Sequence, residues 1–224
     1  MNFLCHAMPY FDNPIKAACT GVPDWLSVVD RKIRARGRLA QQFVDSEDEN
    51  LRDVASGILL HIDDDRWFHG TQAFIETNMR FAVELRDLLP GDAGFRPTFV
   101  GHILIEMILD ALYIRDDAAI GNRYYELLQS VSANEIERCV NLITGKPTDQ
   151  LAPTIKRFIE ARFLFDYLDN ETLLMRLNQV MKRVKLAPLP NSVLGWLPAA
   201  KQLIESRRER LLTPPDGSTP FRFS

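Results

Sequence analysis

Hydrophobic and polar positions follow a helical period along almost the whole chain. Apolar residues recur every three or four positions, and no run alternates over enough residues to predict a strand. We therefore predict an all-α fold of about nine or ten helices. The main helices are expected after Asp45–Glu49 and through His61, at Thr71–Leu89, from Pro97 through His102, and at Ala119–Val131, Ala133–Thr144, Gln150–Leu168, Asn170–Leu186 and Ser192–Leu212.

The length of 224 residues suits one domain, and 46% hydrophobic residues are ample for a core. We predict a single all-α domain over residues 1–212. Residues 213–224 form a tail rich in Pro, Gly and Ser, which is expected to be ordered only by docking. The helix over Thr71–Leu89 is expected to end at Pro90-Gly91.

Two polar stripes interrupt otherwise apolar helices. The segment Phe99–Tyr113 is apolar or small except at His102, Glu106 and Asp110, which lie four residues apart. Residues at that spacing share one side of an α-helix. The upstream segment GILLHIDDDRWFHG carries His61, Asp65 and His69 at the same spacing. Buried imidazoles and carboxylates are unfavourable unless they are paired or hold a metal, so both stripes are candidate ligand sets.

Imidazole and carboxylate ligands suit one or two divalent ions, Zn, Mn or Fe. Residues at i and i+4 can reach one ion, whereas a residue at i+8 lies about 12 Å along the axis. We therefore expect His61, Asp65, His102 and Glu106 to converge on one metal, with His69 and Asp110 at a second ion or in support. Asp63 and Asp64 are expected to point away from this site. Arg66 and Arg80 are the cations expected to bind a phosphate.

Each candidate also has a structural interpretation. His6 can be a core histidine, His61 and Asp65 a surface helix pair, and His69 a helix terminus. Asp24 follows Pro23 and is a natural N-cap. The basic run Arg207–Arg210 is expected to be a solvated helix end.

Four segments, read in order, resemble the acyl carrier protein phosphodiesterase family, an all-α relative of the HD-domain metal-dependent phosphohydrolases. They are MNFLCH, TGVPDW, GILLHIDDDRWFH and HILIE, and the resemblance covers residues 1–115. It departs from the family pattern at Cys5, at Asp64, which replaces an apolar residue, and at His69, which replaces an aspartate. It implies an HD-domain-like metal site in the N-terminal half, with His6 and Asp24 added to its ligands.

A looser similarity connects the chain with bacterial zinc-dependent phospholipases C, which are all-α and usually exported. The order of candidate ligands is similar: His6, Asp24, His61, Asp65, His69, His102 and Glu106. The spacings between the blocks differ. Both resemblances imply phosphoester hydrolysis.

The overall composition bears on the partners and the cellular compartment that we expect for the protein. A net charge of −3 and a pI of about 5.8 do not favour polynucleotide binding. Cys5, Cys19 and Cys139 are an odd number without paired spacing, which suggests reduced thiols in the cytoplasm. No signal peptide is predicted, and no run of about 20 apolar residues predicts a membrane span.

We therefore predict a metal-dependent phosphohydrolase or phosphodiesterase in which a metal-bound hydroxide attacks phosphorus. Its partner would be a small phosphorylated substrate or a phosphopantetheinylated carrier protein. One alternative is a di-iron-type helical oxygenase, although the Glu-x-x-His spacing typical of such bundles is absent. Another is a non-catalytic helical interaction protein whose buried polar stripe specifies helix pairing. The sequence leaves the substrate and the oligomeric state open.

Overall fold

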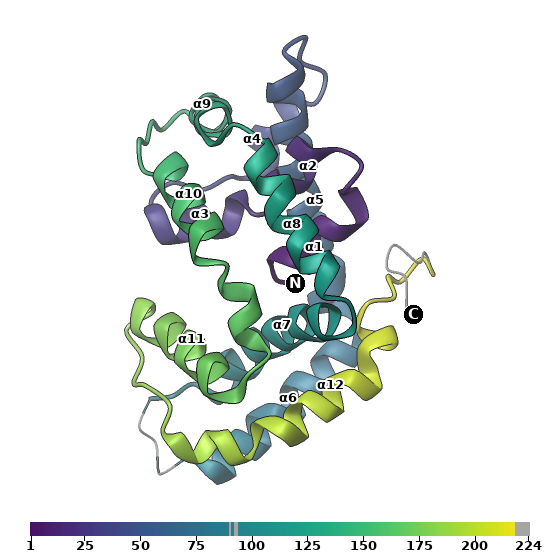
Figure 1. The fold of residues 1–224 in the computed structure, drawn as a ribbon, viewed down its shortest axis with the longest axis vertical. Coiled ribbons are helices and arrows are strands. Elements are labelled where there is room, and N and C mark those ends of the chain that lie inside the picture. The colour runs from purple at the N-terminus through teal and green to yellow at the C-terminus, as the bar shows by residue number, and fades with distance from the viewer. Residues whose placement is uncertain (90, 92–93, 218–224) are drawn as a thin grey trace. The chain divides into compact units, whose positions relative to one another are not determined.

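In the part of the chain that it describes, the computed structural model has twelve α-helices and four short 3-10 helices (Figure 1). It describes residues 1–89, 91 and 94–217, and no strand occurs among them. The all-α prediction is confirmed. Helices outnumber the nine or ten expected, because Pro and Gly divide the first 43 residues into four short helices of four to eight residues.

The chain forms two compact units. Unit 1 comprises Met1, Phe3–Arg66 and Ala119–Arg162, and unit 2 comprises Asn2, Trp67–Ala118 and the chain from Phe163 onward. The long helix α5 (Glu49–Gly70) belongs to unit 1 up to Arg66, and its last turn belongs to unit 2. Of the predicted tail, residues 213–217 are described. Residues 218–224, and Pro90 of the predicted helix stop, lie outside the described residues.

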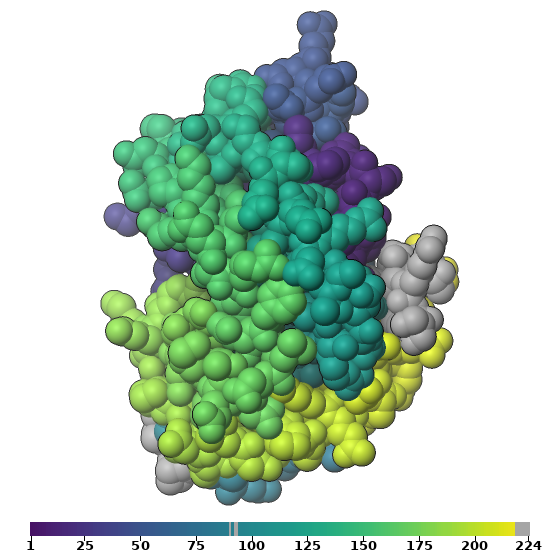
Figure 2. Space-filling view, viewed as in Figure 1, coloured from purple at the N-terminus to yellow at the C-terminus, as the bar shows by residue number. Residues whose placement is uncertain are grey.

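Helices of four to thirteen residues make up most of unit 1. They are α1 (Phe3–Ala7), α2 (Pro14–Cys19), α3 (Val22–Val29), α4 (Gly37–Ala40), α8 (Ala118–Ser130, from Ala119 on), α9 (Ala133–Thr144) and α10 (Leu151–Ala161), with 3-10 turns at Met8–Tyr10 and Gln41–Phe43. The Ser132 hydroxyl accepts from the Glu135 amide and starts α9, and Gly145 ends it in the left-handed region at φ 63°. The side chains of α8, α9 and α10 cover the face of this unit drawn in Figure 2.

Aromatic packing fixes the first helix of unit 1. The Phe3 ring lies 6.0 Å from Trp25 and 4.6 Å from Phe158, centroid to centroid. Trp25 also meets Phe158 edge to face at 5.4 Å. Such pairs add to the stabilisation from burial. The cluster joins α1, α3 and α10, so His6 sits on a packed element rather than a frayed end.

Glycine lets α5 approach α2 closely one turn before His61. A Cβ at Gly57 would lie 2.5 Å from the Lys16 carbonyl oxygen and 2.7 Å from Cys19 Cβ. The Lys16 carbonyl is part of the α2 backbone, and Cys19 Cβ is bonded directly to that backbone, so neither atom can move unless α2 moves. The three cysteines, Cys5, Cys19 and Cys139, are all buried thiols in this unit.

Unit 2 is organised around the apolar helix α7 (Pro97–Asp116). The other elements are α6 (Gln72–Leu88), α11 (Asn170–Arg183), α12 (Leu197–Leu211) and 3-10 turns at Phe163–Tyr167 and Asn191–Gly195. Helices α6 and α12 and the 3-10 turn Phe163–Tyr167 all pack on α7. Gly101 permits the close α6 contact, since a Cβ there would lie 2.7 Å from Asn78 Oδ1.

By length and composition alone, α7 could cross a membrane. However, 67% of its most apolar window is buried within the protein, as in the core helix of a soluble domain. One such helix is weak support for a span, so this finding is compatible with the expectation of none.

Two expectations about the C-terminal half are wrong. The helix predicted over Gln150–Leu168 ends at Ala161, because Arg162 adopts a left-handed conformation with φ 45°. The basic run 207–210 is not simply solvated. Arg207 donates to Thr77 Oγ1 at 2.9 Å and Arg208 pairs with Asp116, so both bind α12 to neighbouring helices of unit 2.

Candidate metal centres

The predicted ligands assemble into two groups, one in each unit. The first, the His6 group, consists of His6, His61 and Asp65, and the second, the His102 group, of His69, His102 and Glu106. In each group one ligand atom per residue lies within 4.8 Å of the other two. His6 completes the couple His61–Asp65, and His69 completes the couple His102–Glu106. The two couples therefore do not converge on one metal, contrary to what was expected.

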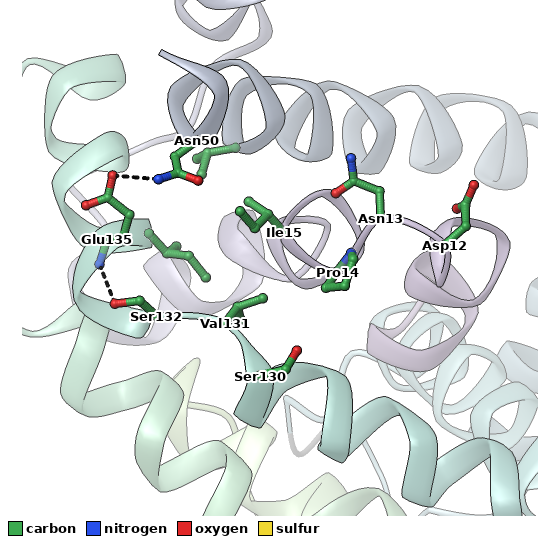
Figure 3. A pocket seen from close by; sticks show the side chains of 11 residues that line it. Asp12, Asn13, Pro14, Ile15, Asn50, Ser130, Val131, Ser132 and Glu135 are labelled. Atoms are coloured by element: carbon green, nitrogen blue, oxygen red, sulfur yellow. Dashed lines mark hydrogen bonds between the residues drawn. The ribbon is translucent and has the colours of Figure 1, made fainter.

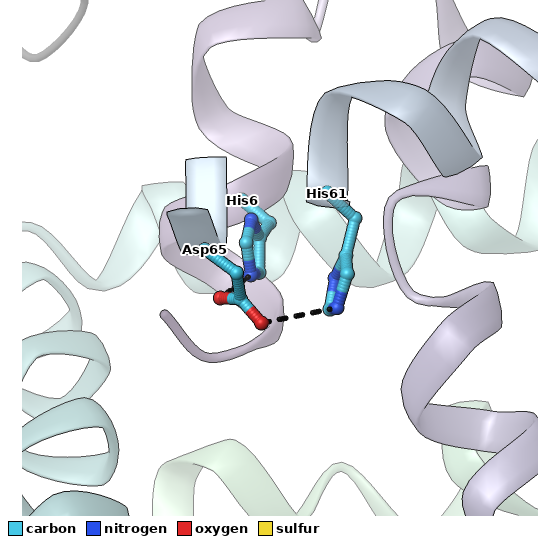
Figure 4. A group of neighbouring side chains, drawn as sticks. All are labelled: His6, His61 and Asp65. Atoms are coloured by element: carbon cyan, nitrogen blue, oxygen red, sulfur yellow. Dashed lines mark ion pairs between the residues drawn. The ribbon is translucent and has the colours of Figure 1, made fainter. Parts of the chain in front are cut away.

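The His6 group joins the N-terminal helix to the middle of α5. The His6 and His61 rings lie 4.2 Å apart, and the Asp65 carboxylate faces both (Figure 4). His6 Nε2 is 3.2 Å from Asp65 Oδ1, and His61 Nε2 is 3.4 Å from Oδ2. Two ligands about 2.0–2.2 Å from one tetrahedral ion are themselves roughly 3.3–3.6 Å apart, so the spacing already suits an ion such as zinc.

Asp64 holds the other side of the His6 ring. His6 Nδ1 lies 3.3 Å from Asp64 Oδ2, to which it can donate a proton, and the Nε2 edge of the ring faces Asp65. Metal-binding histidines typically donate their second ring nitrogen to a carboxylate in this way. Asp64 was expected to point away from the site because it lies off the His61–Asp65 line of the helix, and its contact with His6 shows that this expectation is wrong. The run Asp63–Asp65 in an apolar helix was the available signal.

Burial and charge act in opposite directions on this group. Burial and the N-terminal amino group lower the pKa of His6, but hydrogen bonds to Asp64 and Asp65 raise it more, and the net shift is upward. Burial raises the pKa of Asp65, but His6, the Met1 amino group at 2.6 Å and His61 lower it further, to well below the usual range. Asp65 is therefore a carboxylate available to a cation.

The burial of the N-terminal segment agrees with the expected place of His6 in the site. His6 is fully buried, and the His61 side chain is 7% exposed. The Asp65 side chain is 32% exposed, which gives solvent a route to the group.

The His102 group lies between the last turn of α5 and the first turns of α7. His69 Nε2 is 2.8 Å and His102 Nε2 is 3.2 Å from the same oxygen, Glu106 Oε1. The His69 and His102 rings are 4.4 Å apart, and Phe74 lies within 5.0 Å of both. His69 and His102 keep 27% and 33% of their side chains exposed, so this group is the more open of the two.

Glu106 carries the negative charge of the His102 group. Burial acts to raise its pKa, but the net shift is well below the ordinary value, and the hydrogen bonds from His102 and His69 contribute to that shift. Two imidazoles and one ionised carboxylate therefore make up the donor set here, as in the His6 group. Both sets fit a divalent cation with open positions for water or substrate.

Other predicted site residues lie outside the two groups. Asp24 is in the first turn of α3, but the N-cap of that helix is Gly21, so the capping role predicted for Asp24 is wrong. Asp110 is fully buried in α7, one turn beyond Glu106. Arg66 is 72% exposed and pairs with Asp63 at 2.6 Å, and Arg80 pairs with Glu84 at 2.7 Å. Neither arginine is grouped with the metal ligands.

A cavity of about 570 Å³ lies elsewhere in unit 1, between α2, α5 and the start of α9 (Figure 3). None of the predicted site residues lines it. Three of its polar residues are bonded to one another: Asn50 donates to Glu135 at 3.2 Å, and the Glu135 amide donates to Ser132 Oγ at 3.3 Å. The cavity therefore adds no chemistry to the metal-ligand groups.

Comparisons with known proteins leave the assignment to the geometry. No family model matches the chain, and neither the curated proteins nor the solved structures contain a significant match.

Proposed function

We propose that the protein is a metal-dependent phosphohydrolase or phosphodiesterase with its catalytic ion at the His6 group. The observation that carries the proposal is the donor set: two histidines and one ionised carboxylate at ligand spacing, with Asp64 orienting His6. Two histidines and a carboxylate hold the metal of several zinc hydrolases and leave a position open. A bound divalent ion would supply Lewis acidity, lowering the pKa of water and polarising a phosphoryl oxygen.

The residues of the chain would hold and orient the ion. His6 and His61 would bind through ring nitrogens, and Asp65 would supply charge and the partly exposed side that admits substrate. Arg66 would have to leave its exposed pair with Asp63 to neutralise a phosphoryl group. The His102 group would hold a second ion of the same class, Zn, Mn or Fe. The resemblance of residues 1–115 supports a small phosphorylated substrate or a phosphopantetheinylated carrier protein, and the three free cysteines support a cytoplasmic setting.

An oxygenase is the second candidate. Two histidines and one carboxylate also form the facial triad of non-haem Fe(II) oxygenases. The di-iron variant of that reading has less support, because such bundles use Glu-x-x-His pairs and further glutamates, whereas each group here contains one carboxylate. Iron content with oxygen consumption would favour the oxygenase.

The direct test has two stages. Protein purified without added metal is first analysed for bound ions by mass spectrometry. The loaded protein is then assayed against phosphomonoesters and phosphodiesters with Zn, Mn, Fe or Mg. We expect bound metal, turnover that chelation abolishes, and recovery with Zn or Mn. Bound metal without turnover of any ester would reject hydrolysis, and absence of metal would favour the non-catalytic interpretation, in which the groups are buried ion pairs.

A further inference from the structure

A second chemical feature of unit 1 is a strongly basic segment between α3 and α4. Residues 31–38 read RKIRARGR, with five cations and no acid in eight positions. An even spread of the 27 basic residues over the chain would place about one there. The whole protein carries a net charge of −3, so the remainder is clearly acidic and the positive potential is concentrated on this segment.

The backbone of the segment turns its cations outward. Residues 33–36 lie outside any helix, and the Arg36 amide donates to the Arg34 carbonyl oxygen at 3.0 Å, which makes a tight turn there. Ile33 and Ala35 are buried, whereas Lys32, Arg34 and Arg36 are exposed. The apolar positions thus fix the segment to unit 1 and align three cations on the solvent side, with Arg38 exposed just beyond.

Four of the five cations form no ion pair in the described part of the chain. No ion pair involves Lys32, Arg34, Arg36 or Arg38, although acids are more numerous than bases overall. In contrast, Arg138 of the same unit pairs with both Glu135 and Asp48. Lys146 adds to the patch, since its Nζ donates to the Lys32 carbonyl oxygen at 3.1 Å.

We propose that residues 31–38, together with Lys146, form a surface that binds anionic phospholipid bilayers. Clusters of four to eight Lys and Arg are typical of proteins that bind acidic headgroups. Two exposed aliphatic side chains stand at the ends of the helices that lead into this surface: Val28 of α3 is 47% exposed and Leu142 of α9 is 51% exposed. Apolar groups beside basic residues are the composition that favours the bilayer interface.

The same features argue against a polynucleotide as the partner. Proteins that bind single strands stack bases on aromatic side chains, and the segment RKIRARGR contains none. It also contains no Asn or Gln to read base edges, and most of it lies outside any helix that could enter a major groove.

Co-sedimentation of the full chain with vesicles tests the proposal. We expect binding to phosphatidylcholine vesicles that contain phosphatidylserine, little binding to phosphatidylcholine alone, and loss of binding in high salt. The triple variant Lys32→Gln, Arg34→Gln, Arg36→Gln should bind about a hundredfold more weakly, at roughly fivefold per cation. The matched control removes the same charge elsewhere, with Arg86→Gln, Lys182→Gln and Lys185→Gln, and should bind like the parent protein.

Three results would overturn the proposal. These are no binding to phosphatidylserine vesicles at low salt, equal binding by the triple variant, and binding to a single-stranded oligonucleotide with none to vesicles. The exposed positions of the three substitutions should leave the thermal midpoint unchanged, and the salt dependence of the parent protein tests the charge contribution without any variant. Phosphoester turnover is not needed for any of these readouts, so failure here is distinguishable from failure of the proposed function.

Discussion

The two metal-ligand groups contain the same donors in different surroundings. The His6 group unites two elements 55 residues apart in the chain, and both its histidines are buried. The His102 group draws on the end of α5 and the start of α7, and both its histidines are about 30% exposed. In the His6 group a further carboxylate, Asp64, lies 3.3 Å from His6 Nδ1, the ring nitrogen that does not face Asp65.

This difference bears on what each group can do. A buried group whose donors are already directed at one another needs little rearrangement to bind an ion, and a low local dielectric strengthens the interaction with charge. A more open group exchanges ions and water more readily. We therefore assign the reacting ion to the His6 group.

The largest effect is expected from His6→Ala. It removes one of three ligands, so the protein should lose one equivalent of bound metal and all measurable turnover. The comparison variant is His102→Ala, which should lose one equivalent of metal from the other group and retain turnover. Metal content and steady-state rates of both proteins are the measurements. If His102→Ala abolishes turnover while metal stays at the His6 group, the assignment of the two groups is reversed.

A smaller effect is expected from Asp64→Asn. The amide keeps the shape of the side chain but removes the negative charge that His6 Nδ1 meets at 3.3 Å. Carboxylates in this position typically matter 10–100-fold for metal affinity or activity. Titration with Zn should show weaker binding at an unchanged stoichiometry. Asp63→Asn is the matched control, because Asp63 pairs with the exposed Arg66, and its affinity should equal that of the parent protein.

The fold and the ligand types could be predicted from sequence, whereas the grouping of ligands could not. Helical periodicity and caps located the long helices, with Ala133–Thr144 recovered at both ends. The i, i+4 couples were visible because they interrupt apolar helices. Which histidine completes each couple depends on tertiary packing, such as the Phe3–Trp25 contact that fixes α1. The hydrophobic periodicity of a single sequence gives no information about such tertiary contacts.

The net charge of the whole chain likewise gave no indication of the local basic segment at residues 31–38. The overall net charge of −3 suggested no strong basic surface, yet five cations gather at residues 31–38. An average over the chain cancels a cluster against distant acids, whereas a partner meets only the nearby charges, because ions screen the rest beyond about 8 Å.

The loss of stability caused by a Gly→Ala substitution should differ between the close helix contacts of the two units. Gly57→Ala would place a Cβ 2.5 Å from the Lys16 carbonyl oxygen, so α5 and α2 must separate, and the free energy of unfolding should fall by about 1–3 kcal/mol. Gly101→Ala in unit 2 meets the end of the Asn78 side chain and should cost less. Gly70→Ala, in the same helix as Gly57 but with open space around it, should be neutral or slightly stabilising. Thermal midpoints of the three variants rank these effects, and a Gly57→Ala midpoint equal to that of Gly70→Ala would contradict the close contact.

The smallest effect is the pH dependence of stability in the chelated protein. The folded pKa of His6 is raised above 6.5, so its contribution is complete below pH 6.5 and is lost as pH rises through the folded value. The folded pKa of Asp65 is lowered from 3.8, so its contribution is complete above pH 3.8 and is lost as pH falls through the folded value. The thermal midpoint should therefore be highest between these limits. His6→Gln should weaken the decline on the alkaline side, whereas His102→Gln should leave it in place, since His102 belongs to the other group. Zinc should reverse the alkaline decline, because it binds the neutral imidazole and stabilises the folded state by mass action. A decline that persists unchanged in His6→Gln would show that His6 and its two carboxylates do not govern it.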